Sequence, residues 1–106
     1  MNLTYVDLGN YIVNATSTNN KFALPFAERQ SLTTFHASNV HLITGNATLS
    51  NAPFYNCKAL TFARFDKCYD IGQNVFHSTG FKEIITEPME NVSTGLYIPN
   101  ITTIGI

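Results

Sequence analysis

The chain has 106 residues, of which 44% are hydrophobic and 12% are charged, and its formal net charge is −1 at pH 7. This length and composition predict one folded domain, residues 1–106, and the near-zero charge gives no electrostatic basis for binding nucleic acid. No apolar stretch approaches the roughly 18 residues that span a bilayer, so we expect no membrane insertion.

Short runs of β-branched and aromatic residues, separated by clusters of Asn, Gly, Pro and Ser, predict a mainly β domain. One or two helical turns are expected within Ala23–Leu32, after Pro25. The expected strands, in chain order, are Leu3–Val6, Tyr11–Val13, Leu32–His36, Val40–Ile43, Leu60–Phe65, Lys82–Thr86, Gly95–Ile98 and Ile101–Ile104. The expected turns are Ser17–Asn20, Thr44–Asn46, Ser50–Pro53, Asp70–Asn74, Glu87–Asn91 and Pro99–Asn100.

Strands of this length and spacing fit either a solenoid or a small antiparallel β-sandwich. A repeat favours the solenoid, because Phe26, Phe54 and Phe76 lie in similar surroundings. Counted from Phe54, apolar residues fall at +3, +6, +9 and +11: Cys57, Leu60, Ala63 and Phe65. Counted from Phe26, offsets +6, +9 and +11 give Leu32, Phe35 and Ala37. Such recurrence is expected where each turn of a coil stacks on the next.

Two stretches carry a resemblance to a known family. They are Pro53-Phe54-Tyr55-Asn56-Cys57-Lys58-Ala59-Leu60-Thr61 and Ile98-Pro99-Asn100-Ile101-Thr102-Thr103-Ile104-Gly105. Together they resemble BspA-type leucine-rich repeats, whose pattern is Ala-Phe-Tyr-Asn-Cys-x-x-Leu-Thr followed by Ile-Pro-x-x-Val-Thr-x-Ile-Gly. The resemblance covers roughly residues 8–106, and it departs from the pattern at Pro25 and Pro53, where Ala is usual, and at the insertion Glu87–Gly95.

The resemblance implies a right-handed solenoid of about three or four leucine-rich-type rungs, each with a short parallel strand. Residues 1–25 would form a loose N-terminal cap, 26–86 the clearest repeats, and 87–106 a partial C-terminal repeat. The antiparallel sandwich remains the alternative.

The resemblance also implies a non-enzymatic protein-binding or adhesion module, because such repeats are typical of surface proteins of bacteria and parasitic protists. The alternative is a structural subunit of an assembly, such as a virion decoration, fibre or filament protein. Apolar, strand-like ends at Met1–Val13 and Leu96–Ile106 favour self-association or a protein partner there. No signal peptide is expected in this chain, and a cell-surface, extracellular or virion location is favoured.

No catalytic, metal or cofactor site is expected. A structural zinc site needs about four ligands, and two Cys at the spacing of Cys57 and Cys68 with three scattered His do not make one. The sequence leaves open whether the two cysteines are buried thiols or a disulfide, and whether any of five glycosylation sequons is used.

If offsets +6, +9 and +11 point inward, then +8 and +10 point outward. These outward positions form the candidate partner-binding surface: Thr34, His36, Phe62, Arg64, Ile84 and Thr86. Aromatic residues and Arg are enriched at interface cores. The alternative is a Phe62 turned inward or covered by a loop, so a largely exposed Phe62 is expected only if the surface is used.

Overall fold

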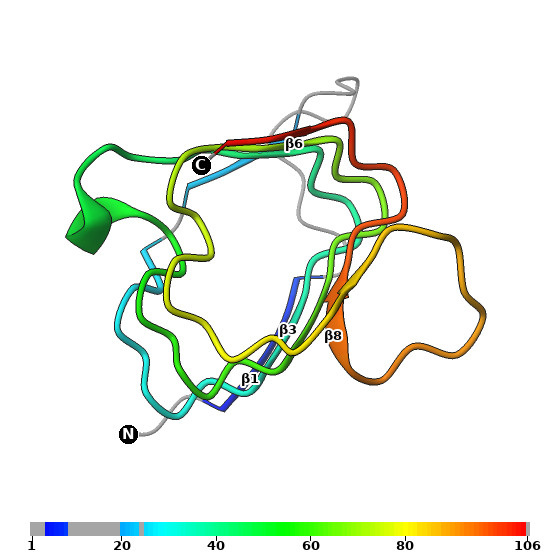
Figure 1. Cartoon of the computed structure of the whole chain (residues 1–106), viewed down its shortest axis with the longest axis horizontal. Helices are drawn as coiled ribbons and strands as arrows, with labels where there is room; N and C mark the ends of the chain where they lie inside the picture. Colours follow the sequence, from blue (N-terminus) through cyan, green and yellow to red (C-terminus); the bar gives the residue numbers. More distant parts are fainter. Residues whose placement is uncertain (1–3, 9–19, 24, 106) are drawn as a thin grey trace.

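The computed structural model describes residues 4–8, 20–23 and 25–105, which form short strands and one 3₁₀ helix, η1 (Leu49–Asn51) (Figure 1). The strands are β1 (Tyr5–Asp7), β2 (Lys21–Phe22), β3 (Thr34–His36), β4 (Leu42–Ile43), β5 (Phe62–Arg64), β6 (Asp70–Ile71), β7 (Ile84–Ile85), β8 (Gly95–Tyr97) and β9 (Thr103–Ile104).

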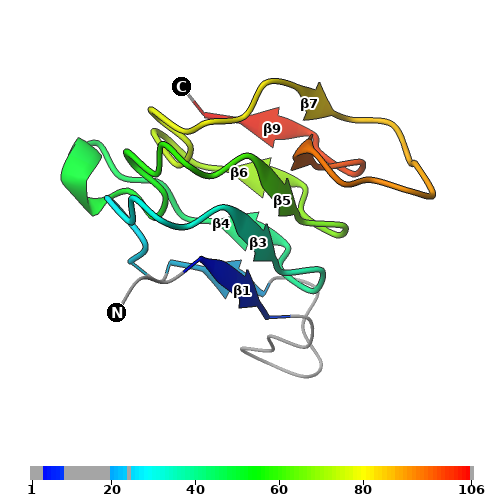
Figure 2. The same ribbon diagram turned by 90° about the horizontal axis from the view of Figure 1, so that it is seen from below.

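The strands form two parallel sheets. The five-stranded sheet has the order β1-β3-β5-β8-β7, and the four-stranded sheet has the order β2-β4-β6-β9. Figure 2 shows β1, β3 and β5 as successive neighbours, with β4, β6 and β9 behind them. Every pairing among the described strands is parallel, so the alternative of an antiparallel sandwich is wrong. The physical reason is that the chain crosses to the other sheet between successive strands of one sheet, whereas antiparallel neighbours follow from short hairpins.

The chain visits the two sheets alternately from β1 to β6, and its passes overlie one another around a common centre (Figure 1). Thr34 pairs with Phe62, and Leu42 pairs with Asp70, so both pairs span 28 positions of sequence. Equal spacing in both sheets means that β5 and β6 add one strand to each sheet without a change of register.

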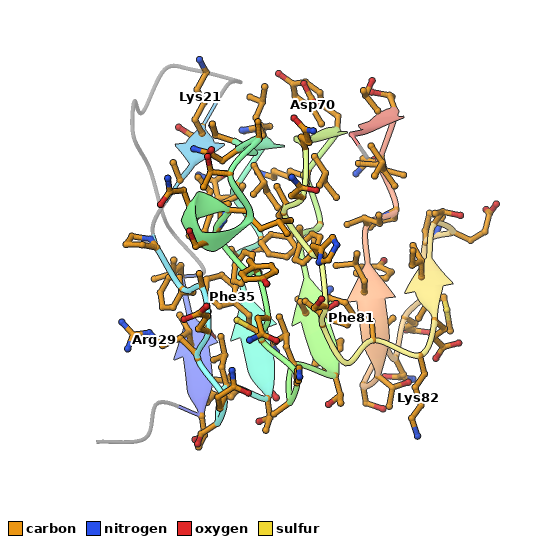
Figure 3. All side chains as sticks on the ribbon, turned by 60° about the vertical axis from the view of Figure 1, so that its left-hand side comes forward. Lys21, Arg29, Phe35, Asp70, Phe81 and Lys82 are labelled. Atoms are coloured by element: carbon orange, nitrogen blue, oxygen red, sulfur yellow. The ribbon has the colours of Figure 1, made fainter. Side chains whose placement is uncertain are left out.

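The inward rows of the two sheets form the core. In the five-stranded sheet, Phe35, Ala63 and Leu96 are paired in register and buried. In the four-stranded sheet the row is Phe22, Ile43, Ile71 and Ile104, of which the first three are buried. Figure 3 places Phe35 inside the fold, whereas Lys21 and Lys82 point away from it.

A third set of backbone segments, 25–28, 53–56 and 75–78, joins the sheets on another side, and we call it the Phe ladder. The Phe26 amide donates to the Pro53 carbonyl at 2.8 Å, and the Phe54 amide donates to the Val75 carbonyl at 3.1 Å. The rings of Phe26 and Phe54 stack at 5.9 Å, and those of Phe54 and Phe76 at 5.2 Å. The three phenylalanines therefore line up, as their surroundings predicted.

The expected helical turns within Ala23–Leu32 are absent from its described residues, so that prediction is wrong. Glu28 has a φ of 63°, in the left-handed region, and its amide donates to the Tyr55 carbonyl at 2.7 Å. A right-handed helix needs negative φ and local hydrogen bonds, and this segment has neither at Glu28.

Strand positions agree with the sequence predictions more closely than strand lengths do. Six expected strands contain β3, β4, β5, β7, β8 and β9, and Leu3–Val6 overlaps β1, although Leu3 itself lies outside the described residues. The expected strand Tyr11–Val13 also lies outside them. Two strands were missed: β2, and β6, which falls in the expected turn Asp70–Asn74. Both β2 and β6 belong to the four-stranded sheet. Because β1 and β2 lie within residues 1–25, the segment that we expected to be a loose cap contributes one strand to each sheet.

The insertion has a definite structure. After β7 the chain forms the loop 86–94 and returns as β8, which pairs with both β5 and β7 (Figure 1). Consequently β7 lies at the edge of the sheet, one strand further out than the repeat predicts.

Candidate functional site: the outer face of the five-stranded sheet

Alternate side chains of β3 and β5 face away from the core. Thr34 pairs with Phe62, and His36 pairs with Arg64, on the face opposite to buried Phe35 and Ala63. The structure therefore brings four of the predicted surface residues together in two adjacent rows.

An aromatic stripe crosses these rows. The rings of Tyr5 and His36 lie 5.4 Å apart, and those of His36 and Phe62 lie 5.2 Å apart at 88°, an edge-to-face arrangement. Tyr5 is 54% exposed, whereas His36 and Phe62 are half-buried. The expectation of a largely exposed Phe62 is therefore not met, and the ring is not fully buried either, because it packs against His36 and keeps part of its surface accessible.

Arg64 provides a positive charge beside the stripe. Its guanidinium donates to both carboxylate oxygens of Asp66, at 2.9 and 2.5 Å, and lies 5.2 Å from the centre of the Tyr97 ring. The hydrogen bond to Asp66 raises the pKa of Arg64. Since these contacts fix the guanidinium, a charged group is presented in a set position next to an apolar one.

A polar depression lies along the same face. Its lining combines acidic, basic and hydroxyl side chains: Asp7, His36, Ser38, Arg64 and Asp66. The depression therefore contains His36 and Arg64 of the two rows, and Phe62 is not among its lining residues.

Tyr97 is the residue of this face that sequence reasoning missed. It pairs with Arg64 in register but is only 5% exposed, and its hydroxyl lies 3.2 Å from the Met89 amide. The loop 86–94 therefore covers one end of the outer face. The expected strand Gly95–Ile98 contained Tyr97, but no local pattern indicated that this strand would lie next to β5.

Ile84 and Thr86 are not part of the group on β3 and β5. Because β8 lies between β5 and β7, Ile84 pairs with Leu96 rather than with a residue of β5. Ile84 is 58% exposed, and Thr86 is exposed at the start of the loop 86–94. The expectation that both adjoin Phe62 and Arg64 is not met, because the insertion changes which strand is the neighbour of β5.

Both cysteines are buried free thiols. Burial raises the pKa of the Cys57 thiol, which lies 3.0 Å from the Phe26 carbonyl oxygen. Burial also raises the pKa of Cys68, to about 11. A thiol held in its neutral form by an apolar environment is a poor nucleophile at neutral pH.

Among the described residues, no group of three or more His, Cys, Asp and Glu is placed to hold a metal ion. No helix among them has the length and apolar character to cross a membrane.

Comparison with known proteins found no match to a family model, to a curated protein or to a solved structure.

Proposed function

We propose that this chain is a non-enzymatic protein-binding module, built as a short right-handed solenoid of about three or four leucine-rich-type rungs. The architecture is supported by the parallel register of both sheets and by the stacked rings of Phe26, Phe54 and Phe76. The handedness follows the strong preference of parallel crossover connections for the right-handed form. The resemblance to BspA-type repeats supports the same architecture and the same class of function.

The observation that carries the functional proposal is the contact between His36 and Phe62 on a half-open outer face, with Arg64 fixed in the adjacent row. The parallel sheet already holds the backbone that carries these side chains, which lowers the ordering cost at binding. Aromatic and Arg side chains dominate the binding energy of many protein interfaces, so the partner surface is assigned to Thr34, His36, Phe62 and Arg64, with Tyr5 at its rim.

Selection from a phage-displayed library of random peptides tests this proposal. Peptides enriched on the immobilised wild-type chain are assayed against the double variant Phe62→Ala/Arg64→Ala, with folding checked by circular dichroism. We expect at least about tenfold weaker binding to the double variant, because the two side chains provide the apolar and the charged contact. The control Ile84→Asp alters an exposed residue outside the group and should bind as the wild type does. Equal binding to all three proteins would contradict the assignment.

The alternative function, a structural subunit of an assembly, is favoured by one observation. The edge strand β9 has exposed residues in Thr103 and Ile104, which leaves a strand edge available for pairing with another subunit. Light scattering on the isolated chain separates the two functions: a fixed oligomer supports the structural subunit, and a monomer supports the binding module.

A further inference from the structure

The Phe ladder ends before the sheets do, by one strand of the four-stranded sheet and by two strands of the five-stranded sheet. The five-stranded sheet has β8 and β7 beyond β5, and the four-stranded sheet has β9 beyond β6. Among the described residues the ladder has only its three segments, 25–28, 53–56 and 75–78. The segment 75–78 therefore has no further ladder segment beside it among the described residues, and an open space lies between this segment and β9.

This open space is an apolar pocket. It is lined by β6, by β9 and by the last ladder segment: Ile71, Gly72, Asn74, Val75, Phe76, His77, Ile104 and Gly105. Phe76 is half-buried and Ile104 is 49% exposed, so both present apolar surface to the opening. We call this pocket the ladder slot.

The backbone beside the slot repeats the hydrogen-bonding positions of the earlier levels. In those levels the amides of Phe26 and Glu28 donate to the second segment, and the amides of Phe54 and Asn56 donate to the third. The equivalent donors of the third segment are the amides of Phe76 and Ser78, for which the described residues supply no backbone acceptor. The last ladder segment therefore ends in two backbone donors with the same spacing as the donor pairs of the two earlier levels.

The earlier levels also show which chemistry fits. In each, an aromatic ring stacks on the ring before it, and the residue two positions later has a left-handed backbone. The φ values are 63° at Glu28, 59° at Asn56 and 63° at Ser78. Asn and Gly adopt this conformation at the lowest cost.

We propose that the ladder slot binds an extended segment of a partner protein in which an aromatic residue is followed two positions later by Asn or Gly. The aromatic ring stacks on Phe76 and contacts Ile104. The segment's carbonyl groups accept hydrogen bonds from the amides of Phe76 and Ser78, so that it adds one level to the ladder. This is recognition by backbone pairing plus one anchoring side chain.

The shape of the end favours a single segment over a second copy of the chain. At the opposite end, β1, β2 and 25–28 each form the first member of their sheet or ladder. At the slot end, β7 extends the five-stranded sheet beyond β9 and the ladder (Figure 2). A second copy would meet β7 before its own ladder segment reached the slot, whereas one extended segment meets no such obstacle.

The probe is a fluorescein-labelled peptide that copies residues 51–58 with the change Cys57→Ser, because this segment already pairs in the ladder. Fluorescence anisotropy with the full chain should show saturable binding. Replacing the peptide's phenylalanine with alanine should weaken binding on the order of tenfold, since the stacked ring is its main apolar contact. The chain variant Ile104→Asp should weaken binding similarly, and the matched variant Ile84→Asp should not.

Three results would overturn the proposal: no binding up to the solubility limit, equal binding of the two peptides, or equal binding to both Asp variants. A concentration-dependent oligomer that Ile104→Asp abolishes would also overturn it, because a second copy would then occupy the slot. The double variant Phe62→Ala/Arg64→Ala should bind the peptide normally. The ladder slot and the outer face therefore succeed or fail independently.

Discussion

The ring of Phe54 lies nearly parallel to that of Phe76, at an interplanar angle of 12° and a centroid distance of 5.2 Å. Phe54 is fully buried, whereas Phe76 is half-buried at the end of the Phe ladder. The two residues have the same side chain and occupy equivalent positions in the Phe ladder. A difference between their contributions to the free energy of unfolding therefore reports on the difference in burial.

The change Phe54→Ala should lower the free energy of unfolding by about 3–5 kcal/mol, because it removes a ring from a closed core. Phe76→Ala should cost roughly half as much, since its side chain is already partly exposed in the folded protein. Urea denaturation measures both values. Equal losses at the two positions would show that the end of the ladder is as closed as its middle.

Gly72 should not tolerate a side chain, although its φ is not in the left-handed region. A Cβ on Gly72 would overlap the backbone nitrogen of Gly45, and a Cβ on Gly45 would overlap the backbone of Gln73. We expect Gly72→Ala to lower the free energy of unfolding by about 2 kcal/mol or more, because backbone has to move apart. The control Gln73→Ala changes an exposed neighbour and should cost less than about 0.5 kcal/mol. Thermal or urea unfolding of both variants makes the comparison.

Ser78 should gain stability when replaced by glycine. Its φ of 63° costs an L-amino acid on the order of 1 kcal/mol, and its side chain is exposed. We expect Ser78→Gly to raise the free energy of unfolding by about 0.5 kcal/mol, after the greater freedom of glycine in the unfolded chain is subtracted. The matched change Ser50→Gly, in η1, relieves no such strain and should destabilise the protein. A destabilising Ser78→Gly would mean that its hydroxyl contact with His77, at 2.9 Å, outweighs the backbone strain.

Alkaline pH should destabilise the protein through Cys68. Burial raises its pKa to about 11 from a usual value of 9.0, so the unfolded chain loses this proton at lower pH than the folded chain does. The stabilisation is complete below about pH 9 and is lost as the pH rises toward 11, by roughly 2 kcal/mol. Urea denaturation at a series of pH values should therefore show a steeper loss in the wild type than in Cys68→Ala. Parallel pH profiles would contradict this assignment, and a thiol count of two after unfolding checks that no disulfide is present.

Part of the fold was predictable from the sequence because it depends on which side chains have to be buried. The offsets from Phe54 identified Cys57, Leu60, Ala63 and Phe65, and all four are buried. The same periodicity assigned Thr34, His36, Phe62 and Arg64 to the opposite face, and register places them there together. A strand alternates its side chains locally, so inward and outward positions can be read from residue types alone.

Which strands become neighbours was decided only by the tertiary structure. The repeat predicted Ile84 beside β5, but the loop 86–94 lets β8 take that place, which covers Tyr97 and moves β7 to the edge of the sheet. Asp70–Ile71 carries turn signals in the sequence, yet it becomes β6 because Leu42 and Ile43 of β4 provide its backbone partner. Pairing between distant segments depends on where the chain returns in space. Local residue preferences therefore predict which side chains enter the core, but they leave the order of the strands undetermined.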